Sequence, residues 1–445
     1  MGAPMTPRST ETTGPRLLRA MGRWDLTAAV VNGVVGSGIF GLPSVLAQHL
    51  GALSPLAFGL GGLGIFAIVL CFAEVSSRFE DGGGPYLYVR ESFGPLTGFQ
   101  VGWLHLWTRL FSAAAVINLF GSYLAQLLPA AGSPSGRALA LTGLVGLLTA
   151  LNVIGVKQAT WAVNLFTVAK LLPLGLLVAL GLPRIGGDVL ATQAVPALDW
   201  PAAVLLVVFA CGGFESAVIP AGEALRPRRD MAFALLVAMA GIVVLYASVQ
   251  LVVVGVVPHA ASTGSAPISA AFRELLGGAG SVAATVAVLV STYGWTSGFV
   301  LATPRILLSM ADRGEVPRVL GAVHPRFRTP HVAILANAAL ALALAVYGSF
   351  AWAVTISVVT RLLVYLLTCG ALVILRARRP HEAPGFRLPG GTALAVLGIA
   401  FCVWLLATRS YEQTWILLVI LGAGVAVWWL ARVDSGRRAR TSAIT

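Results

Sequence analysis

Long apolar runs separated by short polar segments dominate the pattern of this chain. A helix that crosses a bilayer needs roughly 20 apolar residues. Twelve runs meet that need, at about residues 26–48, 54–78, 97–128, 138–155, 161–182, 201–222, 231–257, 280–309, 331–348, 351–375, 391–408 and 413–431. The linkers between them are too short to fold alone. The pattern predicts an all-α integral membrane protein with twelve transmembrane helices.

Composition and charge agree with a membrane location. Hydrophobic residues make up 57% of the 445 residues, charged residues only 11%, and the mean hydropathy is +0.86. The net charge of +13 does not indicate a nucleic-acid partner, because 23 of the 30 Lys and Arg fall in alternate segments and only four in the others. The positive-inside rule therefore predicts a multi-pass protein of the cell membrane, with cytoplasmic tails at 1–24 and 433–445. The oligomeric state is left open.

Glycine pairs are predicted to interrupt two of the apolar runs. Gly36-Ser37-Gly38 interrupts the first run, and Gly212-Gly213 interrupts the sixth, just before Phe214 and Glu215. A break at mid-depth leaves backbone groups without helical partners, and these must face protein, water or a ligand. Two such breaks predict a small-molecule site in the middle of the membrane. The alternative is that the glycines only allow close helix packing.

The positions of the breaks suggest an internal repeat. One lies in the first predicted helix and the other in the sixth, so helices 1–5 (25–185) and 6–10 (199–378) form halves of odd helix number and opposite orientation. This is the inverted-repeat plan of many secondary transporters. Helices 11 and 12 (388–432) are then peripheral additions.

The broken helices offer two kinds of polar backbone group. The half-helix after Gly38 presents free N–H groups and a positive dipole end, which suit a carboxylate. The half-helices that end before Gly36 and around Gly212 present free carbonyls, which suit an ammonium group. The zwitterionic backbone of an amino acid matches both.

Three ionisable residues within the predicted spans need a partner. Glu215 follows the second break, while Arg109 and Arg361 lie inside helices 3 and 10. Charges at mid-membrane are costly and are usually paired. We expect Glu215 to close an inner gate through one of the two arginines, or to form a permanent structural ion pair. Glu74 and Arg78, one helical turn apart, are expected to pair locally.

The motifs also resemble a known family. The stretch from Gly33 to Pro43, the stretch from Phe209 to Ser216, and Glu74-Val75-Ser76-Ser77-Arg78-Phe79 followed by Gly83-Gly84-Pro85-Tyr86 are similar to signatures of the amino acid–polyamine–organocation superfamily. The resemblance implies the five-plus-five inverted repeat, often named after a leucine transporter, and alternating access around a midplane site.

The resemblance also implies which residues bind substrate. Backbone N–H groups of Gly36, Ser37 and Gly38 would receive the carboxylate. Carbonyls of Val34, Phe209 and Gly212 would receive the ammonium, and Gly213 completes the second break. Trp295 resembles a helix-8 aromatic residue that contacts the substrate side chain in some members, although packing in the core is an equal alternative.

Lys170 resembles a helix-5 lysine of the sodium-independent members, where its ammonium replaces the sodium ion. Thr303 is the one hydroxyl in the helix-8 stretch that supplies sodium ligands in coupled relatives. This implies sodium-independent transport. A buried lysine that releases its proton would couple protons to the substrate, and one that stays charged would fit an exchanger or facilitator.

Other functional classes find less support. The spans hold no nucleophile with a base, no metal-ligand spacing and no repeated filter, so the sequence indicates neither an enzyme nor a channel, and no cofactor or metal is expected. A cationic amino acid or polyamine carrier and a non-transporting sensor stay open. Because Glu215 has two candidate arginines to neutralise it, the sequence favours a neutral amino acid.

Overall fold

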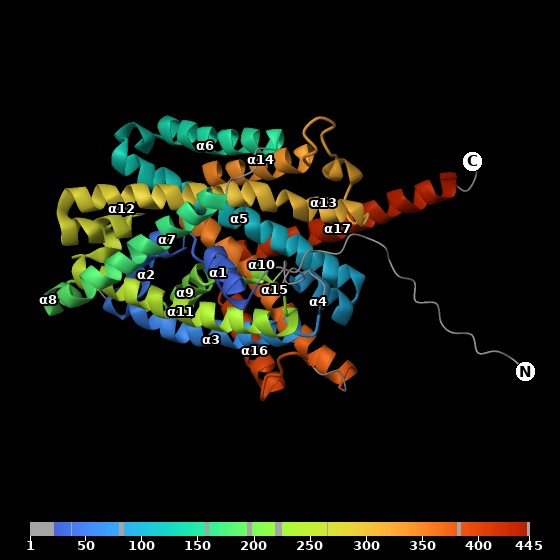
Figure 1. Cartoon of the computed structure of the whole chain (residues 1–445), viewed down its shortest axis with the longest axis horizontal. Coiled ribbons are helices and arrows are strands. Elements are labelled where there is room, and N and C mark those ends of the chain that lie inside the picture. The colour runs from blue at the N-terminus through green and yellow to red at the C-terminus, as the bar shows by residue number, and fades with distance from the viewer. Residues whose placement is uncertain are drawn as a thin grey trace, which may run out of the picture.

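The computed structural model describes residues 22–36, 38–79, 84–155, 160–193, 198–218, 225–264, 266–380 and 384–442. The predicted site residue Ser37 lies outside these ranges. Every regular element of the described chain is a helix (Figure 1). The α-helices are α1 (Arg23–Val34), α2 (Gly38–Leu50), α3 (Ser54–Ser76), α4 (Gly84–Phe93), α5 (Pro95–Leu127), α6 (Pro134–Ile154), α7 (Thr160–Gly181), α8 (Gly187–Ala191), α9 (Trp200–Ala210), α10 (Phe214–Ala217), α11 (Pro227–Val256), α12 (Pro267–Ala302), α13 (Pro304–Asp312), α14 (His331–Tyr347), α15 (Phe350–Arg378), α16 (Gly391–Ala407) and α17 (Tyr411–Ser442).

The membrane class predicted from the sequence is confirmed. Within the described ranges, seven segments are long and apolar enough to cross a membrane: Gly38–Ser76, Pro95–Leu127, Pro134–Ile154, Arg229–Val256, Pro267–Asp312, Phe350–Arg378 and Tyr411–Val433. Shorter apolar helices lie at Trp200–Ser216, His331–Tyr347 and Gly391–Ala407. The number of twelve spans stays a prediction. The segment Gly38–Ser76 contains two helices, and several of the other predicted spans correspond to helices of fewer than 18 residues.

Both predicted breaks are present. α1 ends at Val34 and α2 begins at Gly38, while α9 ends at Ala210 and α10 begins at Phe214. Gly213 has a φ of 116°, a conformation that side chains with a Cβ rarely adopt. At Gly38 a Cβ would lie 2.7 Å from Cα of Ala210, so the two broken helices meet closely at their interruptions.

Local sequence signals fix several helix starts. Ser133, Asp199 and Ser349 accept hydrogen bonds from backbone N–H groups three residues later, at 3.0–3.1 Å, and so cap α6, α9 and α15. Proline occupies the first turn of α3, α5, α6, α9 and α12, where its missing N–H costs nothing.

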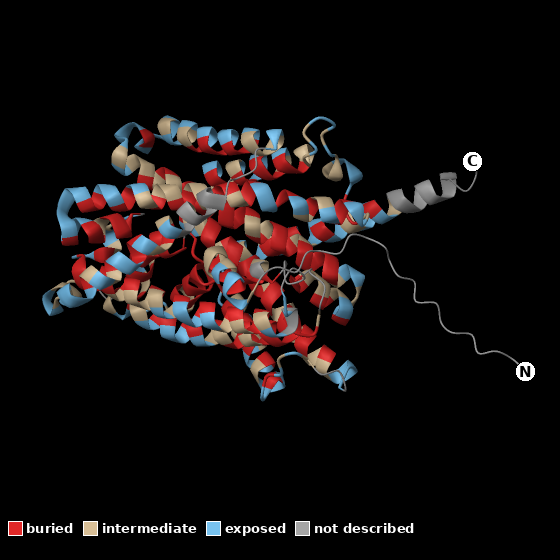
Figure 2. Cartoon of the chain, viewed as in Figure 1, coloured by how far each residue is buried: buried red, intermediate tan, exposed pale blue. Residues whose placement is uncertain are grey.

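The core surrounds the broken helices. Buried residues concentrate in the middle of the bundle, where α5 packs against α15 and α3 against α11 (Figure 2). Outer helices expose large apolar side chains instead, such as Leu139 of α6, Leu397 of α16 and Trp415 of α17. Exposed apolar side chains on membrane-length helices are the surface that lipid covers.

Three details differ from the predicted pattern. α12 begins at Pro267 and turns at Gly277, whose φ is 73°, so it starts earlier than the predicted span. The sequence predicts one helix to residue 309. In the structure α12 ends at Ala302 and α13 begins at Pro304, because proline lacks the N–H that would continue the helix. The separate helix α4 was not predicted, because it is short and mixed in polarity.

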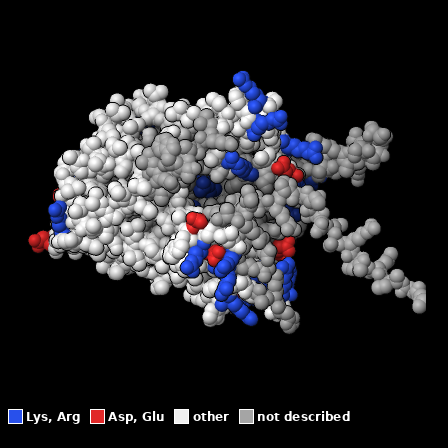
Figure 3. All heavy atoms as spheres, in the orientation of Figure 1, with Lys and Arg blue, Asp and Glu red and all other residues white. Residues whose placement is uncertain are grey.

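Charged side chains gather at one end of the molecule (Figure 3). This end, called the charged end below, contains the segment after α13 and the end of α15 with the residues that follow it. The arginines there are Arg313, Arg318, Arg326, Arg328, Arg376, Arg378, Arg379 and Arg387.

Candidate functional site

A small cavity lies between the two helix breaks. Its volume is about 30 Å³, and it is lined by Gly33, Val34, Gly36, Gly38, Arg109, Ser112, Phe209, Gly212, Gly213, Trp295 and Arg361. Nine residues that the sequence singled out therefore line the same cavity. The space is about what one water molecule occupies, so a larger ligand would need the walls to separate.

The breaks approach each other so closely that glycine is required. A Cβ at Gly213 would lie 2.5 Å from the carbonyl oxygen of Gly33, and one at Gly212 would collide with the guanidinium of Arg361. The carbonyl of Phe209 already accepts from the N–H groups of Cys211 and Gly212, the latter at 3.1 Å. A carbonyl has two lone pairs, so an ammonium that binds here replaces one of these donors.

Glu215 pairs with Arg361, which the sequence left undecided. Its Oε1 lies 3.0 Å from Nε of Arg361, and both side chains are buried. Its Oε2 accepts hydrogen bonds from the N–H of Gly213 at 2.8 Å and from the hydroxyl of Tyr365 at 2.9 Å. Glu215 thus joins the second break to α15. Sequence reasoning missed Tyr365, which lies one helical turn from Arg361 on α15.

Arg109 is not part of that ion pair. Its guanidinium carbon lies 4.9 Å from the ring centre of Trp295, over the face of the indole. No described carboxylate lies within ion-pair distance of it. Trp295 in turn stacks on Phe299 with an interplanar angle of 5°. Trp295 both lines the cavity and packs against Phe299, and its contact with substrate stays a prediction.

Lys170 contacts the end of α1. Its buried ammonium donates to the side-chain oxygen of Asn32 at 2.9 Å and to the backbone oxygen of Asn32 at 3.2 Å. Asn32 lies in the last turn before the first break. The lysine of α7 therefore holds the half-helix whose final carbonyls face the cavity. Thr303, the candidate sodium ligand, has a buried hydroxyl without a hydrogen-bond partner in the described chain.

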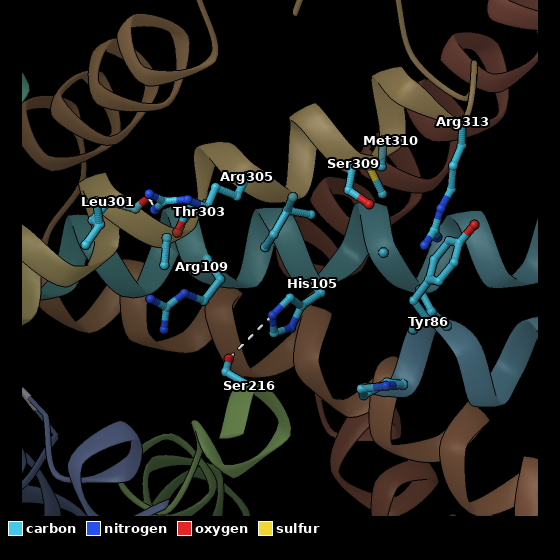
Figure 4. Close-up of a pocket in the computed structure, with 15 residues that line it drawn as sticks. Tyr86, His105, Arg109, Ser216, Leu301, Thr303, Arg305, Ser309, Met310 and Arg313 are labelled. Carbon is cyan, nitrogen blue, oxygen red and sulfur yellow. Dashed lines mark hydrogen bonds between the residues drawn. The ribbon is translucent and has the colours of Figure 1, made fainter. Parts of the chain in front are cut away.

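A larger vestibule of about 460 Å³ reaches toward the small cavity from the charged end (Figure 4). Arg109 lines both spaces and stands at their junction. His105 lines the vestibule, and its Nε2 lies 3.4 Å from the hydroxyl oxygen of Ser216. The rest of the wall comes mainly from α12, α13 and the start of α4.

Tyr86 and Arg313 form the outer rim of this vestibule. The guanidinium of Arg313 lies 4.7 Å from the ring centre of Tyr86. The Tyr86 hydroxyl donates to Glu315 at 2.6 Å and accepts from Arg90. Burial, helped by the bond to Glu315, raises the pKa of Tyr86, so the phenol stays protonated at neutral pH. Opening of the rim therefore requires these contacts to break, but it requires no change in the protonation of Tyr86.

A second buried carboxylate lies near the charged end. Glu74 pairs with Arg78 at 2.8 Å, as predicted, and also accepts from Arg376 at 2.9 and 2.5 Å and from the N–H of Leu388 at 2.9 Å. Sequence reasoning missed Arg376 and Leu388, because both lie about 300 residues away along the chain. This cluster fastens α3 to α15 and to the loop before α16.

Comparison with known proteins identifies the family. A family profile described as amino acid permease matches residues 21–427, nearly the whole chain. The chain belongs to the amino acid permease family. The resemblance to the amino acid–polyamine–organocation superfamily is thereby confirmed, and the protein is a multi-pass membrane transporter of small molecules of the amino acid class, not an enzyme.

Three relatives show the range of this similarity. The chain is 27% identical to a serine/threonine exchanger of Bacillus subtilis, over 90% of this chain and 94% of the relative. It is 26% identical to a branched-chain amino acid permease of the same organism, over 94% of each chain. It is 30% identical to a polyamine transporter of Oryza sativa subsp. japonica, over 81% of this chain and 68% of the relative.

Proposed function

We propose that this permease carries an amino acid across the cell membrane by alternating access, independently of sodium and with proton coupling. The observation that supports this most directly is the pair of helix breaks around one cavity, with a vestibule leading toward it from one end. The twelve-span, five-plus-five inverted repeat with two added helices is part of the same proposal. The boundaries at 25–185, 199–378 and 388–432 follow from it.

The proposed orientation follows from charge. The arginine-rich charged end faces the cytoplasm by the positive-inside rule, and both termini lie on that side. The vestibule then opens inward. On the other side of the cavity, a Cβ at Gly41 would lie 2.7–2.8 Å from Phe350 and Leu119, and Tyr123 donates to the carbonyl of Phe40. This close packing is what an inward-facing state requires of its outer gate.

The substrate's backbone would bind the two breaks. N–H groups of Gly36, Ser37 and Gly38 at the start of α2 suit the carboxylate, since the first N–H groups of a helix lack partners within it. The carbonyls of Val34, Phe209 and Gly212, at the ends of the half-helices, suit the ammonium. Trp295 forms the wall nearest the side chain.

Lys170 supports sodium independence. Its ammonium already donates to Asn32 at the end of α1, which leaves this position without need of a metal cation. If the proton leaves Lys170 during the cycle, proton movement is linked to substrate. If it stays, the protein works as an exchanger, the activity that the name of the Bacillus relative states.

A cationic substrate is the second candidate, because one relative is named a polyamine transporter. The walls oppose it here. Arg109 and Arg361 line the cavity, and Arg305 and Arg313 line the vestibule. Two like charges 4 Å apart repel by about 4 kcal/mol at an effective dielectric constant near 20.

The test is uptake of labelled amino acids into proteoliposomes without sodium, with and without an inward proton gradient. Wild type should show saturable uptake that the gradient drives to accumulation. Lys170→Met should still exchange internal for external substrate but lose gradient-driven accumulation. Binding without flux would indicate a sensor. A sodium requirement, or accumulation by Lys170→Met under a proton gradient alone, would overturn the role given to Lys170.

A further inference from the structure

Among the described residues at the centre, one carboxylate, Glu215, faces two arginines, Arg109 and Arg361, while the ammonium of Lys170 donates to Asn32 and not to a carboxylate. Glu215 is paired with Arg361 at 3.0 Å. Arg109 has the face of Trp295 as its partner and no described carboxylate within ion-pair distance. The sequence favours a neutral substrate because Arg109 and Arg361 are both candidates to neutralise Glu215. In the structure Arg361 neutralises Glu215, and Arg109 has no carboxylate partner among the described residues.

The lining of both spaces sharpens this imbalance. The described residues that line the vestibule and the small cavity include four arginines, namely Arg109, Arg305, Arg313 and Arg361, and no Asp or Glu. Arg305 turns its guanidinium to the carbonyl of Leu301, and Arg313 is at the rim over Tyr86. Arg109 alone stands where the vestibule meets the cavity.

Arg361 adds a second donor at the same place. Its side chain is 4% exposed, and Nη1 has no hydrogen-bond partner among the described residues. That guanidinium lies against Gly212, on the wall of the small cavity. A buried guanidinium N–H without an acceptor is costly, and a carboxylate is the acceptor whose shape and charge fit it best. Two guanidinium groups thus face one cavity with donors to spare.

The contact with Trp295 leaves Arg109 able to bind an anion. A guanidinium held over an aromatic face by its charge still has its N–H groups available as donors. The aromatic face supplies attraction without satisfying those donors. The arrangement fixes the orientation of Arg109 while its donors stay available.

We propose that the substrate is an acidic amino acid, whose side-chain carboxylate binds Arg109, with Arg361 Nη1 as a second donor. This inference rests on the proposed function, since it takes the helix breaks as the site for the substrate's backbone. Entry through the vestibule fits the same charge, because its walls attract anions. The side-chain carboxylate supplies the negative charge that the described site lacks.

The first experiment compares matched ligands on purified wild-type protein. Dissociation constants for L-glutamate and L-glutamine, and for L-aspartate and L-asparagine, are measured from thermal shifts and by competition for uptake. Each pair has nearly the same shape and differs by one charge. At least one acid should bind about tenfold or more tightly than its amide, as a charge-assisted hydrogen bond in a buried site would give.

The second experiment removes the surplus charge. Arg109→Gln should abolish the preference for the acid while retaining binding of the amide, and Arg109→Lys should retain part of the preference. Arg326→Gln is the control, because it removes one positive charge from the charged end without touching either cavity. It should leave the preference unchanged. Size-exclusion profiles and melting temperatures without ligand establish that each variant is folded.

The outcomes separate this inference from the proposed function. If neutral amino acids bind and are carried while neither acid is preferred, or if Arg109→Gln keeps the preference, the inference is wrong and the proposed function stands. If no amino acid binds or moves, the proposed function fails. Replacement of chloride by gluconate should not remove the preference. If chloride alone stabilises wild type but not Arg109→Gln, and the acids do not, an inorganic anion is the partner and the inference is overturned.

Discussion

Two buried carboxylates, Glu74 near the charged end and Glu215 at the centre, are surrounded very differently. Both oxygens of Glu74 accept hydrogen bonds, from Arg78, Arg376 and the N–H of Leu388. At Glu215 only Oε2 does so, while Oε1 has the charge of Arg361 near it without a hydrogen bond of good geometry. Two arginines serve Glu74, whereas only one of the two central arginines pairs with Glu215.

The difference distinguishes a structural ion pair, at Glu74, from a group that takes part in transport, at Glu215. A buried ion pair with every acceptor satisfied holds its elements in one arrangement. A carboxylate oxygen that accepts no hydrogen bond, such as Oε1 of Glu215, can exchange partners at lower cost when a ligand arrives or a gate moves, whereas unused guanidinium donors occur beside both carboxylates. We therefore assign Glu74 to the architecture of the charged end and Glu215 to the transport cycle. Each prediction below tests that division.

The largest effect on stability is expected at Glu74. Glu74→Gln leaves Arg78 and Arg376 without their counter-charge, and breaking a buried ion pair costs about 3–5 kcal/mol. The free energy of unfolding should fall by that amount, measured by denaturation in detergent. Substrate affinity of the folded fraction should stay at the wild-type value.

The matched control is the exposed pair of Glu91 and Arg379, whose carboxylate and guanidinium lie 3.4 Å apart. Both side chains are more than 40% exposed. Glu91→Gln should cost no more than about 1 kcal/mol, as solvent screens such pairs. Equal losses at Glu74 and Glu91 would contradict the role of Glu74 as a fastening.

The next largest effect is expected on transport, at Glu215. Glu215→Gln keeps an oxygen for the N–H of Gly213 but removes the charge that holds Arg361. It should slow net transport about tenfold or more while ligand binding persists, because gate closure loses roughly 1.4 kcal/mol or more of attraction. Equal loss of binding and transport would show that Glu215 is a direct ligand or a folding element.

A double-mutant cycle sharpens this result. Glu215 and Arg361 are in contact, so their coupling free energy should be about 1–3 kcal/mol. The coupling between Glu215 and Arg109 should be clearly smaller, because Arg109 makes no ion pair with it. Couplings of the same size would show that the negative charge is shared and that Arg109 is not surplus.

The smallest effect is expected at Tyr365. Tyr365→Phe removes one hydrogen bond to Glu215, while the N–H of Gly213 keeps its own. The expected loss of stability is about 1–2 kcal/mol, with transport affected less than in Glu215→Gln. A stronger transport defect than that of Glu215→Gln would place the hydroxyl, rather than the carboxylate, at the gate.

Local signals in the sequence predicted the breaks and their neighbours. Glycine pairs in the first and sixth apolar runs predicted breaks there, so the ends of α1 at Val34 and of α9 at Ala210 were expected, whereas Gly61-Gly62 lies inside the continuous helix α3. The pair of Glu74 and Arg78 followed from helical spacing. The turn at Gly277 was not expected, because Gly277-Gly278 lies in the linker before the predicted span at 280–309.

Contacts between distant segments were beyond the sequence. In the sequence Arg376 is one more charge in a predicted cytoplasmic segment. Only the fold shows that it contacts Glu74. Arg109 and Arg361 were equivalent partners for Glu215, since spacing along the chain does not show how two helices rotate against each other. The choice between them decides the charge of the site.

The central claim is that the cavity between the two helix breaks binds the substrate. The direct measurement is the ligand-induced thermal shift of wild type, Gly36→Val and Gly422→Val against the proteinogenic amino acids. A Cβ at Gly36 would lie 3.2 Å from Nε1 of Trp295, whereas Gly422 has open space around it. A ligand at 100 times its Kd should stabilise wild type and Gly422→Val by about 2.7 kcal/mol, and folded Gly36→Val should show no shift. A wild-type shift retained in Gly36→Val would contradict the assignment.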